Sequence, residues 1–508
     1  MIQPTFSKRI LLCGVILFMG SLSGFSQSNR EAAIKQVLPQ TLKTHREFIS
    51  IPNVNTNKED MHKNLAWVKR AFEKQRFAVR LLETATLPVF LAERIVSKKA
   101  KTLLIYLHID GQAVNPANWD QEDPFIPVLK QDNGKGTWQA MDWSRMDGDI
   151  DPEWRIFGRS AADDKAPIIM LLTALELMES QKTQLQFNLK VLIDSEEEGG
   201  PSGLTQTLEQ YKSEYASDYM LIMDGPAHPT NKPTLTFGFR GSAGCRITVY
   251  GARLPQHSGH YGNYAPNPVF TLSHLLASMK DESGRVTIKG FYDGIEITPD
   301  IAAILRQVPD DESKIKAELV INQPDLVGNN YQESLQYPSL NVRHIETSWK
   351  GPGVKTIIPE VITAHLDVRL VVETDGAAQI EKIRQHIIDQ GFLVLDREPT
   401  DEERLTNARI VKFFGYPGGN AYRADMNSAF AQKLRASIQN EFGEPPVSIR
   451  TMGGSVPLLS VINTLGIPAI IVPTVNMDNN QHNPNENIRI GNMTEGIRIC
   501  MTLLSMTL

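Results

Sequence analysis

Cysteine, excess charge and long apolar runs are all scarce in this sequence. Three cysteines in 508 residues are too few for a disulfide scaffold, and Cys245 and Cys500, the two beyond the N-terminal region, lack zinc-site spacing. We expect both to be buried apolar residues, with one disulfide as the alternative. The net charge of −6 argues against a nucleic-acid partner, because phosphate binding needs a basic face. Apolar residues at 41% and charged residues at 22% are typical of a soluble globular protein.

The N-terminus has the pattern of a secretory signal. A basic pair, Lys8-Arg9, precedes a mostly apolar run at 10–19 and mainly small residues at 20–24. We expect a signal peptide over residues 1–26, cleaved near Ser26–Gln27, and hence a periplasmic or secreted bacterial protein. Because the apolar run is short for a bilayer span, an uncleaved anchor is the alternative, and no other stretch predicts a membrane span.

Several apolar runs of strand length end in an acid or lead to a histidine. Such runs suit strands that are buried on both faces of a mostly parallel sheet. Because ligands of open α/β sheets bind at the carboxyl edge of the strands, we expect these polar ends to lie together. The runs are Thr102–Leu107 before His108 and Asp110, Phe187–Ile193 before Asp194 and Glu196–Glu198, Tyr219–Met223 before Asp224, and Ala469–Pro473 before the loop of His482.

The periodicity of the chain changes near residue 239. The segments with helical periodicity before this point and near the C-terminus are 31–49, 60–76, 166–178 and 427–442. Between them, 242–250 and 361–372 alternate like half-exposed strands, while 268–280 and 378–390 are helical in pattern. We therefore predict an α/β catalytic domain over 27–238 and 423–508, with a mostly parallel mixed sheet flanked by helices, and an inserted α+β domain over 239–422.

Histidines and carboxylates gather at the predicted sheet edge. Histidine nitrogen and carboxylate oxygen are ligands of zinc, and a surplus of carboxylates indicates two metals that share a bridging one. Each motif also has a plain structural explanation, since His-x-Asp pairs and runs of glutamate are common on solvated surfaces. The candidate residues are His108, Asp163, Glu197, Glu198, Asp224 and His482.

A series of short motifs runs along the chain in a fixed order. They are His108-x-Asp110, Gly158-Arg159-Ser160 through Asp163-Asp164-Lys165, Glu197-Glu198-x-Gly200, Asp224, His257-Ser258-Gly259, Thr356–Pro359, Gly453-Gly454-Ser455 and His482-x-Pro484-Asn485-Glu486. This order resembles that of the dizinc metallopeptidases, a family of carnosinase-like dipeptidases, aminoacylases, glutamate carboxypeptidases and succinyl-diaminopimelate desuccinylase. The resemblance covers about residues 35–505, and Asn267-Pro268 with the stretch 284–293 looks most like the dipeptidase branch.

The resemblance implies two Zn²⁺ ions per chain, a zinc-peptidase-like fold and a cis peptide bond between Asp163 and Asp164. It implies that Asp163 bridges the ions, that Glu198 and His482 complete one site, and that His108 and Asp224 complete the other. Asp110 would orient His108 and raise its basicity. Glu197 would be the general base, which takes a proton from the metal-bridging water and returns it to the leaving amine. Glu196 is left out of the pair, because the segment 199–204 aligns best with Glu197-Glu198 as the motif.

The resemblance also implies that the inserted domain forms a homodimer and binds the substrate. His257 would reach across the dimer to polarise the scissile carbonyl, as an oxyanion-hole donor. Arg369 would clamp the substrate carboxylate, with Thr356, Gly454 and Ser455 as further substrate-binding residues. The structural alternatives are a surface histidine in a turn for His257, a surface strand charge for Arg369 and a turn residue for Ser455.

Two features depart from the family pattern. Ala166-Pro167 stand where glycines are usual, and an insertion of about 30 residues between His108 and Asp163 holds Trp119, Trp138, Trp143 and Trp154. The insertion would either wall the substrate cleft or cover the sheet edge.

These residues favour an exported zinc dipeptidase or carboxypeptidase-like exopeptidase, which cleaves an amide bond next to a free carboxylate. An N-acyl-amino-acid deacylase is the alternative, since the motifs do not separate the two. A catalytically inactive binding protein is disfavoured because all six candidate residues are present. A serine hydrolase is disfavoured because Ser455 is not in a nucleophile elbow.

Overall fold

The computed structural model describes residues 10–134, 136–199, 203–349, 353 and 355–508, with side chains from residue 29 onward. The chain divides into two compact units, one made of Met1–Thr236, Ala424–Ser448 and Ser460–Leu508, the other of Phe237–Arg423 and Ile449–Leu459. Residues 1–9 of the predicted signal and residues 200–202 of the acidic motif lie outside the described residues. In the described part of the chain, no helix combines the length and apolar character needed to cross a bilayer.

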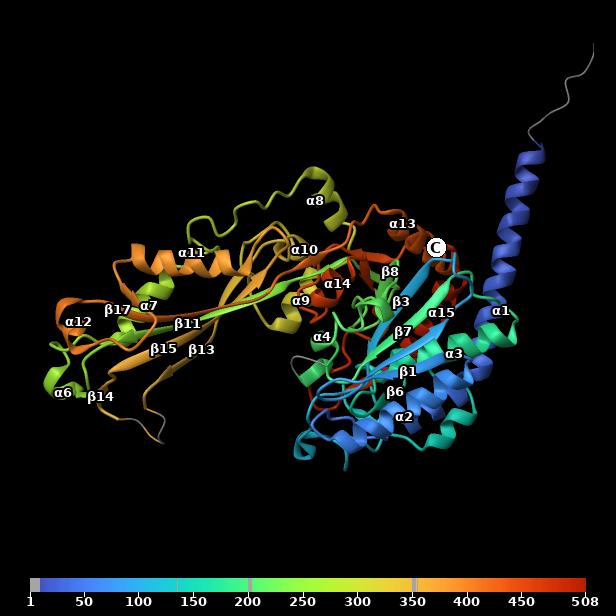
Figure 1. The fold of residues 1–508 in the computed structure, drawn as a ribbon, viewed down its shortest axis with the longest axis horizontal. Coiled ribbons are helices and arrows are strands. Elements are labelled where there is room, and N and C mark those ends of the chain that lie inside the picture. The colour runs from blue at the N-terminus through green and yellow to red at the C-terminus, as the bar shows by residue number, and fades with distance from the viewer. Residues whose placement is uncertain (1–9, 135, 200–202, 350–352, 354) are drawn as a thin grey trace, which may run out of the picture. The chain divides into compact units, whose positions relative to one another are not determined.

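The first unit is built on a mixed sheet whose central strands are parallel (Figure 1). Its strands run in the order β1-β2-β7-β3-β8-β20-β9-β19, and β7, β3, β8 and β20 pair in parallel. The interior of β3 is buried, as its continuous apolar sequence predicts, and the whole of β7 is buried although it includes the polar residues Asn188, Lys190 and Asp194. The bounds are β1 Ala78–Leu82, β2 Val89–Arg94, β3 Thr102–His108, β7 Asn188–Asp194, β8 Tyr219–Ile222, β9 Thr234–Thr236, β19 Val447–Ile449 and β20 Ala469–Ile471.

Helices pack on this sheet and on one another. Helix α3 contacts β3, α1, and α15, while α2 packs against β1 and β2. The start of α2 is fixed by Asn57, whose side chain accepts a hydrogen bond from the Asp60 backbone N–H. The bounds of the helices in this unit are α1 Ile10–Ile49, α2 Lys58–Lys74, α3 Lys165–Ser180, α4 Gly203–Gln206, α5 Lys212–Tyr215, α13 Ala429–Phe442 and α15 Ile490–Ser505.

The tryptophan-rich insertion forms part of a second, smaller sheet. Its strands β4 Val128–Asp132, β5 Trp138–Ala140 and β6 Arg155–Phe157 pair with β21 Asn487–Arg489 in the order β21-β6-β4-β5. Short 3-10 helices, η1 Pro116–Asn118 and η2 Trp143–Asp147, flank these strands. The insertion, which follows β3 in the sequence, therefore pairs with the strand that follows His482. The sequence pattern did not predict this pairing.

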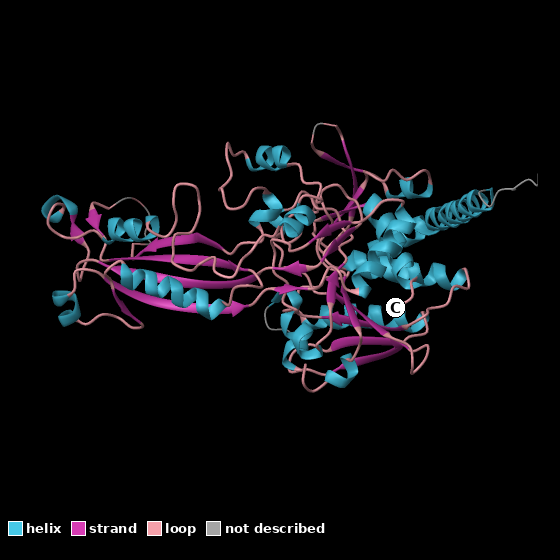
Figure 2. Cartoon of the chain, turned by 90° about the horizontal axis from the view of Figure 1, so that it is seen from above, coloured by secondary structure: helices cyan, strands magenta, loops and turns pink. Residues whose placement is uncertain are grey.

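The second unit is a five-stranded antiparallel-dominated sheet with helices on one face (Figure 2). Its order is β13-β15-β11-β17-β16, and α7 and α11 pack against β11. Alternate residues of β11 and β15 are buried in one apolar core, as their alternating sequences predict. The bounds of all the strands in this unit, those outside the five-stranded sheet included, are β10 Gly238–Phe239, β11 Gly241–Tyr250, β12 Gln256–His257, β13 Ser339–Thr347, β14 Ile357–Ile358, β15 Val361–Leu370, β16 Leu393–Leu395, β17 Ile410–Gly419 and β18 Tyr422–Arg423.

The remaining helices complete the second unit, and α14 follows its final segment. The helices of the second unit are α6 Ser258–Tyr261, α7 Pro268–Ala277, α8 Pro299–Leu305, α9 Glu312–Leu319, α10 Tyr331–Ser334, α11 Gly376–Asp389 and α12 Asp401–Thr406, whereas α14 Leu459–Leu465 belongs to the first unit from Ser460 onward. The predicted α/β fold with a mixed sheet flanked by helices is confirmed. The segment Ile449–Leu459, which the sequence analysis assigned to the catalytic domain, belongs to the second unit. Cys245 and Cys500 are buried free thiols, as expected.

Candidate metal centre

The carboxyl edge of the parallel strands collects the predicted polar residues. His108 is the last residue of β3, and Asp224 follows β8 by two positions. Glu197 and Glu198 lie in the 3-10 helix η3 Glu197–Gly199, directly after β7. Asp163 stands just before α3, where the chain returns to the sheet. The topology therefore explains why residues far apart in the sequence meet here.

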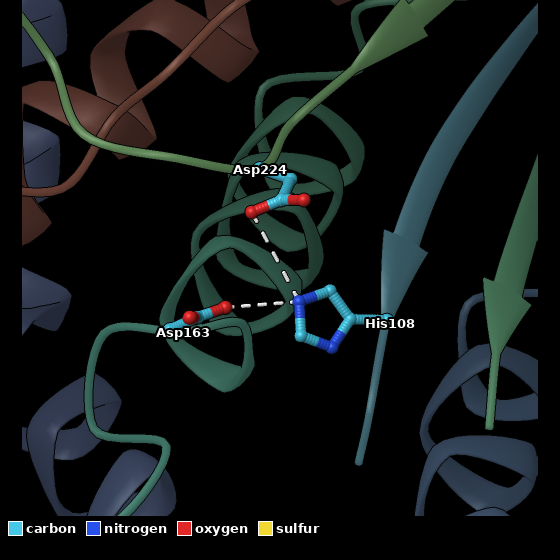
Figure 3. Close-up of side chains that lie close together, drawn as sticks. All are labelled: His108, Asp163 and Asp224. Carbon is cyan, nitrogen blue, oxygen red and sulfur yellow. Dashed lines mark hydrogen bonds and ion pairs between the residues drawn. The ribbon is translucent and has the colours of Figure 1, made fainter. Parts of the chain in front are cut away.

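One cluster of possible ligands contains His108, Asp163 and Asp224 (Figure 3). His108 Nε2 lies 2.9 Å from Asp163 Oδ1 and 3.9 Å from Asp224 Oδ1. The three ligand atoms are within 4.8 Å of one another, and the His108 and Asp163 side chains are buried. This arrangement gives one nitrogen and two carboxylate oxygens that converge on the same space.

A second cluster contains Asp163, Glu198 and His482. His482 Nε2 lies 3.2 Å from Asp163 Oδ2 and 3.3 Å from Glu198 Oε2. Asp163 thus presents its Oδ1 to the first cluster and its Oδ2 to the second. This is the arrangement expected of a bridging carboxylate. The structure brings together the five residues that were predicted as metal ligands, and their role as ligands stays a prediction.

Asp110 connects His108 to the acidic motif. The His108 ring Nδ1 lies 3.2 Å from the Asp110 backbone oxygen and 3.4 Å from its Oδ1. The same carboxylate accepts hydrogen bonds from the backbone N–H groups of Glu197 and Glu198, both at 3.0 Å. Asp110 is therefore placed to fix the ring orientation of His108 and the position of both glutamates at once.

The centre concentrates carboxylates where water is largely excluded. Burial, together with the charges of Asp224 and Glu198, raises the pKa of Glu197 to about 9. Burial and the Asp163 charge raise the pKa of Glu198 to about 7 and that of Asp224 to about 6. Burial opposes ionisation of Asp163 too, but hydrogen bonds from His108 and His482 hold its pKa below the ordinary value.

This donor set fits a pair of divalent cations. Mutually repelling carboxylates with raised pKa values are stabilised when positive charge lies between them. The two imidazoles and three carboxylates of the clusters are the ligand types that zinc takes in enzymes.

The chain around Asp163 has the predicted backbone geometry. The Asp163–Asp164 peptide bond is cis, as the resemblance implied. The buried Asp164 carboxylate accepts a hydrogen bond from the His108 backbone N–H at 3.2 Å. The residue next to the shared carboxylate therefore also holds the end of β3.

Two of the predicted substrate-binding residues meet in the second unit. Arg369 Nη1 donates to Ser455 Oγ at 3.0 Å, and Arg369 Nε donates to Asp367 Oδ2 at 3.3 Å. The backbone N–H of Arg240 donates to the Gly454 oxygen at 3.0 Å. Burial and the neighbouring Arg369 charge lower the pKa of Arg240 to about 10. The Arg240 side chain is buried, whereas the Arg369 guanidinium is partly exposed between Asp367 and the Ser455 hydroxyl.

His257 and Thr356 form a second group in this unit. His257 pairs with Ile357 between β12 and β14, and the Ser258 backbone N–H donates to the Thr356 oxygen at 3.2 Å. His257 is exposed, and its Nδ1 accepts a hydrogen bond from the Gly259 N–H at 3.0 Å. That bond leaves Nε2 as the ring nitrogen able to reach an outside group.

Several polar residues near the centre were not predicted from the sequence. Gln112 donates to Glu198 Oε2 at 2.7 Å, and Asn55 donates to Asp110 Oδ2 at 3.0 Å. Arg240 was missed in the second unit. Gln112 could have been noticed because it lies close in sequence to the His108 motif. Asn55 lies in no motif, so the sequence gives no signal for it.

The mixed α/β fold and two clusters whose donor atoms suit divalent cations are the features expected of a metal-dependent hydrolase. Residues 104–506 match the model of peptidase family M20/M25/M40, so the chain belongs to that family and is a metallopeptidase.

Proteins of known function show the same relationship. Human Beta-Ala-His dipeptidase is 24% identical over 422 residues, 81% of this chain and 76% of the relative. The Cys-Gly metallodipeptidase of Candida albicans is 27% identical, covering 79% of this chain and 77% of its own. The structure of human carnosine dipeptidase 1 matches with a TM-score of 0.71 at 20% identity, over 94% of this chain and 98% of that one. This last similarity supports the fold.

Proposed function

We propose that the chain is a dizinc dipeptidase, which hydrolyses a peptide bond next to a free carboxylate. The observation that carries the proposal is the division of the Asp163 oxygens between two clusters, His108 with Asp224 and Glu198 with His482. The names of the relatives, a Beta-Ala-His dipeptidase and a Cys-Gly metallodipeptidase, support dipeptides as the substrate class.

The five residues of the two clusters would hold two zinc ions. When bound, the ions supply the Lewis acidity that polarises the scissile carbonyl and acidifies the attacking water. Glu197 belongs to neither cluster, although it is largely buried beside both. Its carboxylate is therefore free to accept the proton of the attacking water and to deliver it to the leaving nitrogen.

The backbone around Glu197 supports this proton transfer. The Asp110 carboxylate accepts hydrogen bonds from the backbone N–H groups of both Glu197 and Glu198, and so fixes the backbone from which the two side chains leave. One acid can then remain a fixed ligand while its neighbour changes its protonation state. This division of labour accounts for two adjacent glutamates at one site.

Recognition of the substrate carboxylate is assigned to Arg369 and Ser455. Arg369 already donates to the Ser455 hydroxyl, and its guanidinium is partly exposed, so further N–H groups are open to a ligand. A planar guanidinium binds a carboxylate through two parallel hydrogen bonds. We assign His257 to the scissile carbonyl, as a donor that acts on the substrate of a second subunit in a homodimer.

Metal analysis and a substrate panel test the proposal. Elemental analysis of active protein should give two zinc ions per chain, and chelation should remove the activity until zinc is returned. Fully active protein with one ion or none would contradict the dinuclear assignment. The same zinc-loaded protein should hydrolyse dipeptides such as β-Ala-His or Cys-Gly faster than N-acetyl amino acids. The reverse preference would indicate a deacylase.

We also propose that the protein is exported. The support is the basic, apolar and small-residue pattern of residues 1–26. Expression in a bacterial host and sequencing of the N-terminus of the purified protein should give a new terminus near Gln27. An intact N-terminus on cytoplasmic protein would contradict export.

A further inference from the structure

Arg159 and Glu486 form a buried ion pair that the mechanism above does not use. Both belong to motifs, Arg159 four residues before Asp163 and Glu486 four residues after His482. Arg159 Nη1 donates to Glu486 Oε2 at 2.7 Å, and both side chains are buried. The pair therefore joins two chain segments, each of which carries a proposed ligand of the same cluster.

The Glu486 carboxylate also organises the backbone that leads to Asp163. Its Oε1 accepts hydrogen bonds from the N–H groups of Ala162 and Asp163, both at 3.0 Å, and its Oε2 accepts one from the Ser160 N–H at 3.0 Å. With Arg159, four donors surround one carboxylate. Such a fully bonded buried charge fixes local geometry, and it is disrupted when one acceptor atom is replaced.

The tryptophan-rich insertion also contacts the loop that carries His482 and Glu486. Asp120 and Asn485 exchange hydrogen bonds of 2.9 and 3.0 Å, and the Arg159 guanidinium lies 5.3 Å from the Trp119 ring centroid. The Gly158 N–H donates to the Glu486 backbone oxygen at 3.0 Å. The loop that carries His482 is thus held from two sides.

The two clusters differ in how much they depend on this loop. The His482 side chain is 52% exposed, whereas those of Asp163 and Glu198 are 5% exposed. His482 is therefore positioned by its loop and little by side-chain packing. By contrast, His108 ends a central strand and Asp224 closely follows another, so two of the three members of the first cluster are placed by the sheet, and only Asp163 is shared with the loop.

We propose that the Arg159–Glu486 pair is a positioning device that acts mainly on one metal position, that of Asp163, Glu198 and His482, because it holds the loops of two of its ligands, and acts more weakly on the other position, with which it shares only Asp163. The inference rests on the proposed dinuclear function. Residues that orient metal ligands from behind typically change metal affinity 10- to 100-fold.

Zinc titration of the metal-free full-length protein tests the inference, with a chelator as competitor. Wild type should take up two equivalents. Glu486→Gln replaces an acceptor oxygen by an NH₂ group, so we expect at least tenfold weaker binding of one equivalent and less than about threefold change in the other. Cobalt substitution should show the same selectivity, because the absorption of one of two Co²⁺ equivalents should appear only at higher metal concentration.

Glu441→Gln is the matched control. Glu441 is also buried, and it pairs with Arg30 and Arg498 at 2.7 and 2.8 Å without a bond to either ligand loop. This variant should bind both equivalents like wild type, even if its thermal stability falls as far as that of Glu486→Gln. Equal weakening in the two variants would show a general loss of stability and would overturn the proposal.

The remaining outcomes separate the inference from the function. Wild type that binds a single equivalent would refute the dinuclear centre itself. Two wild-type-like affinities in Glu486→Gln would refute only the positioning role. If Glu486→Gln does not fold, Asp120→Ala removes the side-chain acceptor of Asn485 Nδ2 and keeps the backbone N–H donation to Asn485, so it should weaken the same equivalent by about two- to fivefold. An unselective change, or none, in that variant would then overturn the inference.

Discussion

The consecutive residues Glu196, Glu197 and Glu198 enter the same edge of the sheet but have different surroundings. The Glu196 carboxylate bonds the Thr86 hydroxyl and accepts the Gly203 N–H at 3.1 Å, away from the metal centre. The Glu198 carboxylate lies 3.3 Å from His482, and the Glu197 side chain is largely buried without joining a cluster. Identical side chains therefore have separate tasks because the backbone turns between them.

Substitution of each glutamate by glutamine should separate these tasks. Glu197→Gln should lower kcat by about 10²- to 10⁴-fold with both zinc ions retained, because the proton carrier is lost and no ligand is. Glu198→Gln should lose one zinc ion. Glu196→Gln should keep both the metal and most of the activity. Parallel elemental analysis and kinetics check this, and a metal-replete inactive Glu196→Gln would show that the register of the acidic motif is wrong.

Arg369 offers a test of carboxylate recognition. Arg369→Ala should raise KM about 10- to 100-fold for dipeptides with a free C-terminus, since a charge-assisted pair is lost. Amidated dipeptides should bind poorly to both proteins and change little between them. Comparison of KM for the acid and the amide in each protein gives the answer. An equal loss for both substrates would mean that Arg369 stabilises the second unit and does not bind the carboxylate.

At the scale of elements, sequence periodicity predicts the centre of the sheet better than its borders. The strands β3, β8 and β20 are apolar runs and β7 is a mostly apolar one that includes Asn188 and Lys190, and all four lie where the predicted runs placed them. Strands at the borders, such as β9 and β19, are three residues long and carry no clear alternation. The pairing of the insertion with β21 was beyond prediction too, because it joins segments more than 300 residues apart.

The same limit applies to the site. The ligand candidates could be predicted because they stand at strand ends or in motifs with a strict order. Asn55 and Gln112 stand outside these motifs and act through hydrogen bonds that tertiary structure creates, and the bond from the His108 N–H to Asp164, although Asp164 lies in a motif, was likewise not predicted. Likewise, the grouping of Ile449–Leu459 with the second compact unit could not be predicted, because Met452 of this segment bridges Phe239 of the two-residue strand β10, more than 200 residues earlier in the sequence.

The contact of α3 with α15 gives a prediction about an element that supports the centre. A Cβ atom on Gly496 of α15 would lie 2.1 Å from the Met170 sulfur on α3. Gly496→Ala gains about 1 kcal/mol of helix propensity, but overpacking costs about 1–3 kcal/mol, so we expect a lower free energy of unfolding. Denaturant unfolding measures the change.

A double variant shows whether this contact is the cause. Met170→Ala alone should destabilise by about 2–5 kcal/mol because it leaves a cavity. In Gly496→Ala/Met170→Ala the new methyl group enters that cavity, so the loss should be smaller than the sum of the single losses. Strict additivity would show that Gly496 is required for another reason.

At the scale of the whole molecule, the proposed chemistry is divided between two compact units. The ligand clusters and Glu197 belong to the first unit, whereas His257, Arg369 and Ser455 belong to the second. A single chain with an intact metal centre would therefore still depend on the second unit for binding and for carbonyl polarisation. The proposed homodimer adds that the histidine serves the partner's substrate.

Mixed dimers test this last proposal. His257→Ala should lower kcat by about 10²- to 10³-fold, as the loss of one oxyanion donor does, with the zinc content unchanged. Glu197→Gln should be nearly inactive as well. When the two variants are mixed and their subunits exchange, one site of each heterodimer combines an intact Glu197 with an intact His257.

That site should restore up to about a quarter of the activity of an equal amount of wild type, because random exchange makes half of the dimers mixed and each mixed dimer has one complete site of two. The exchange itself is followed independently, by mass spectrometry of differently tagged chains. Confirmed heterodimers without recovered activity would mean that His257 serves the substrate of its own chain or none. Recovery can arise only if the two residues of one site come from different subunits, because neither homodimer holds an intact pair.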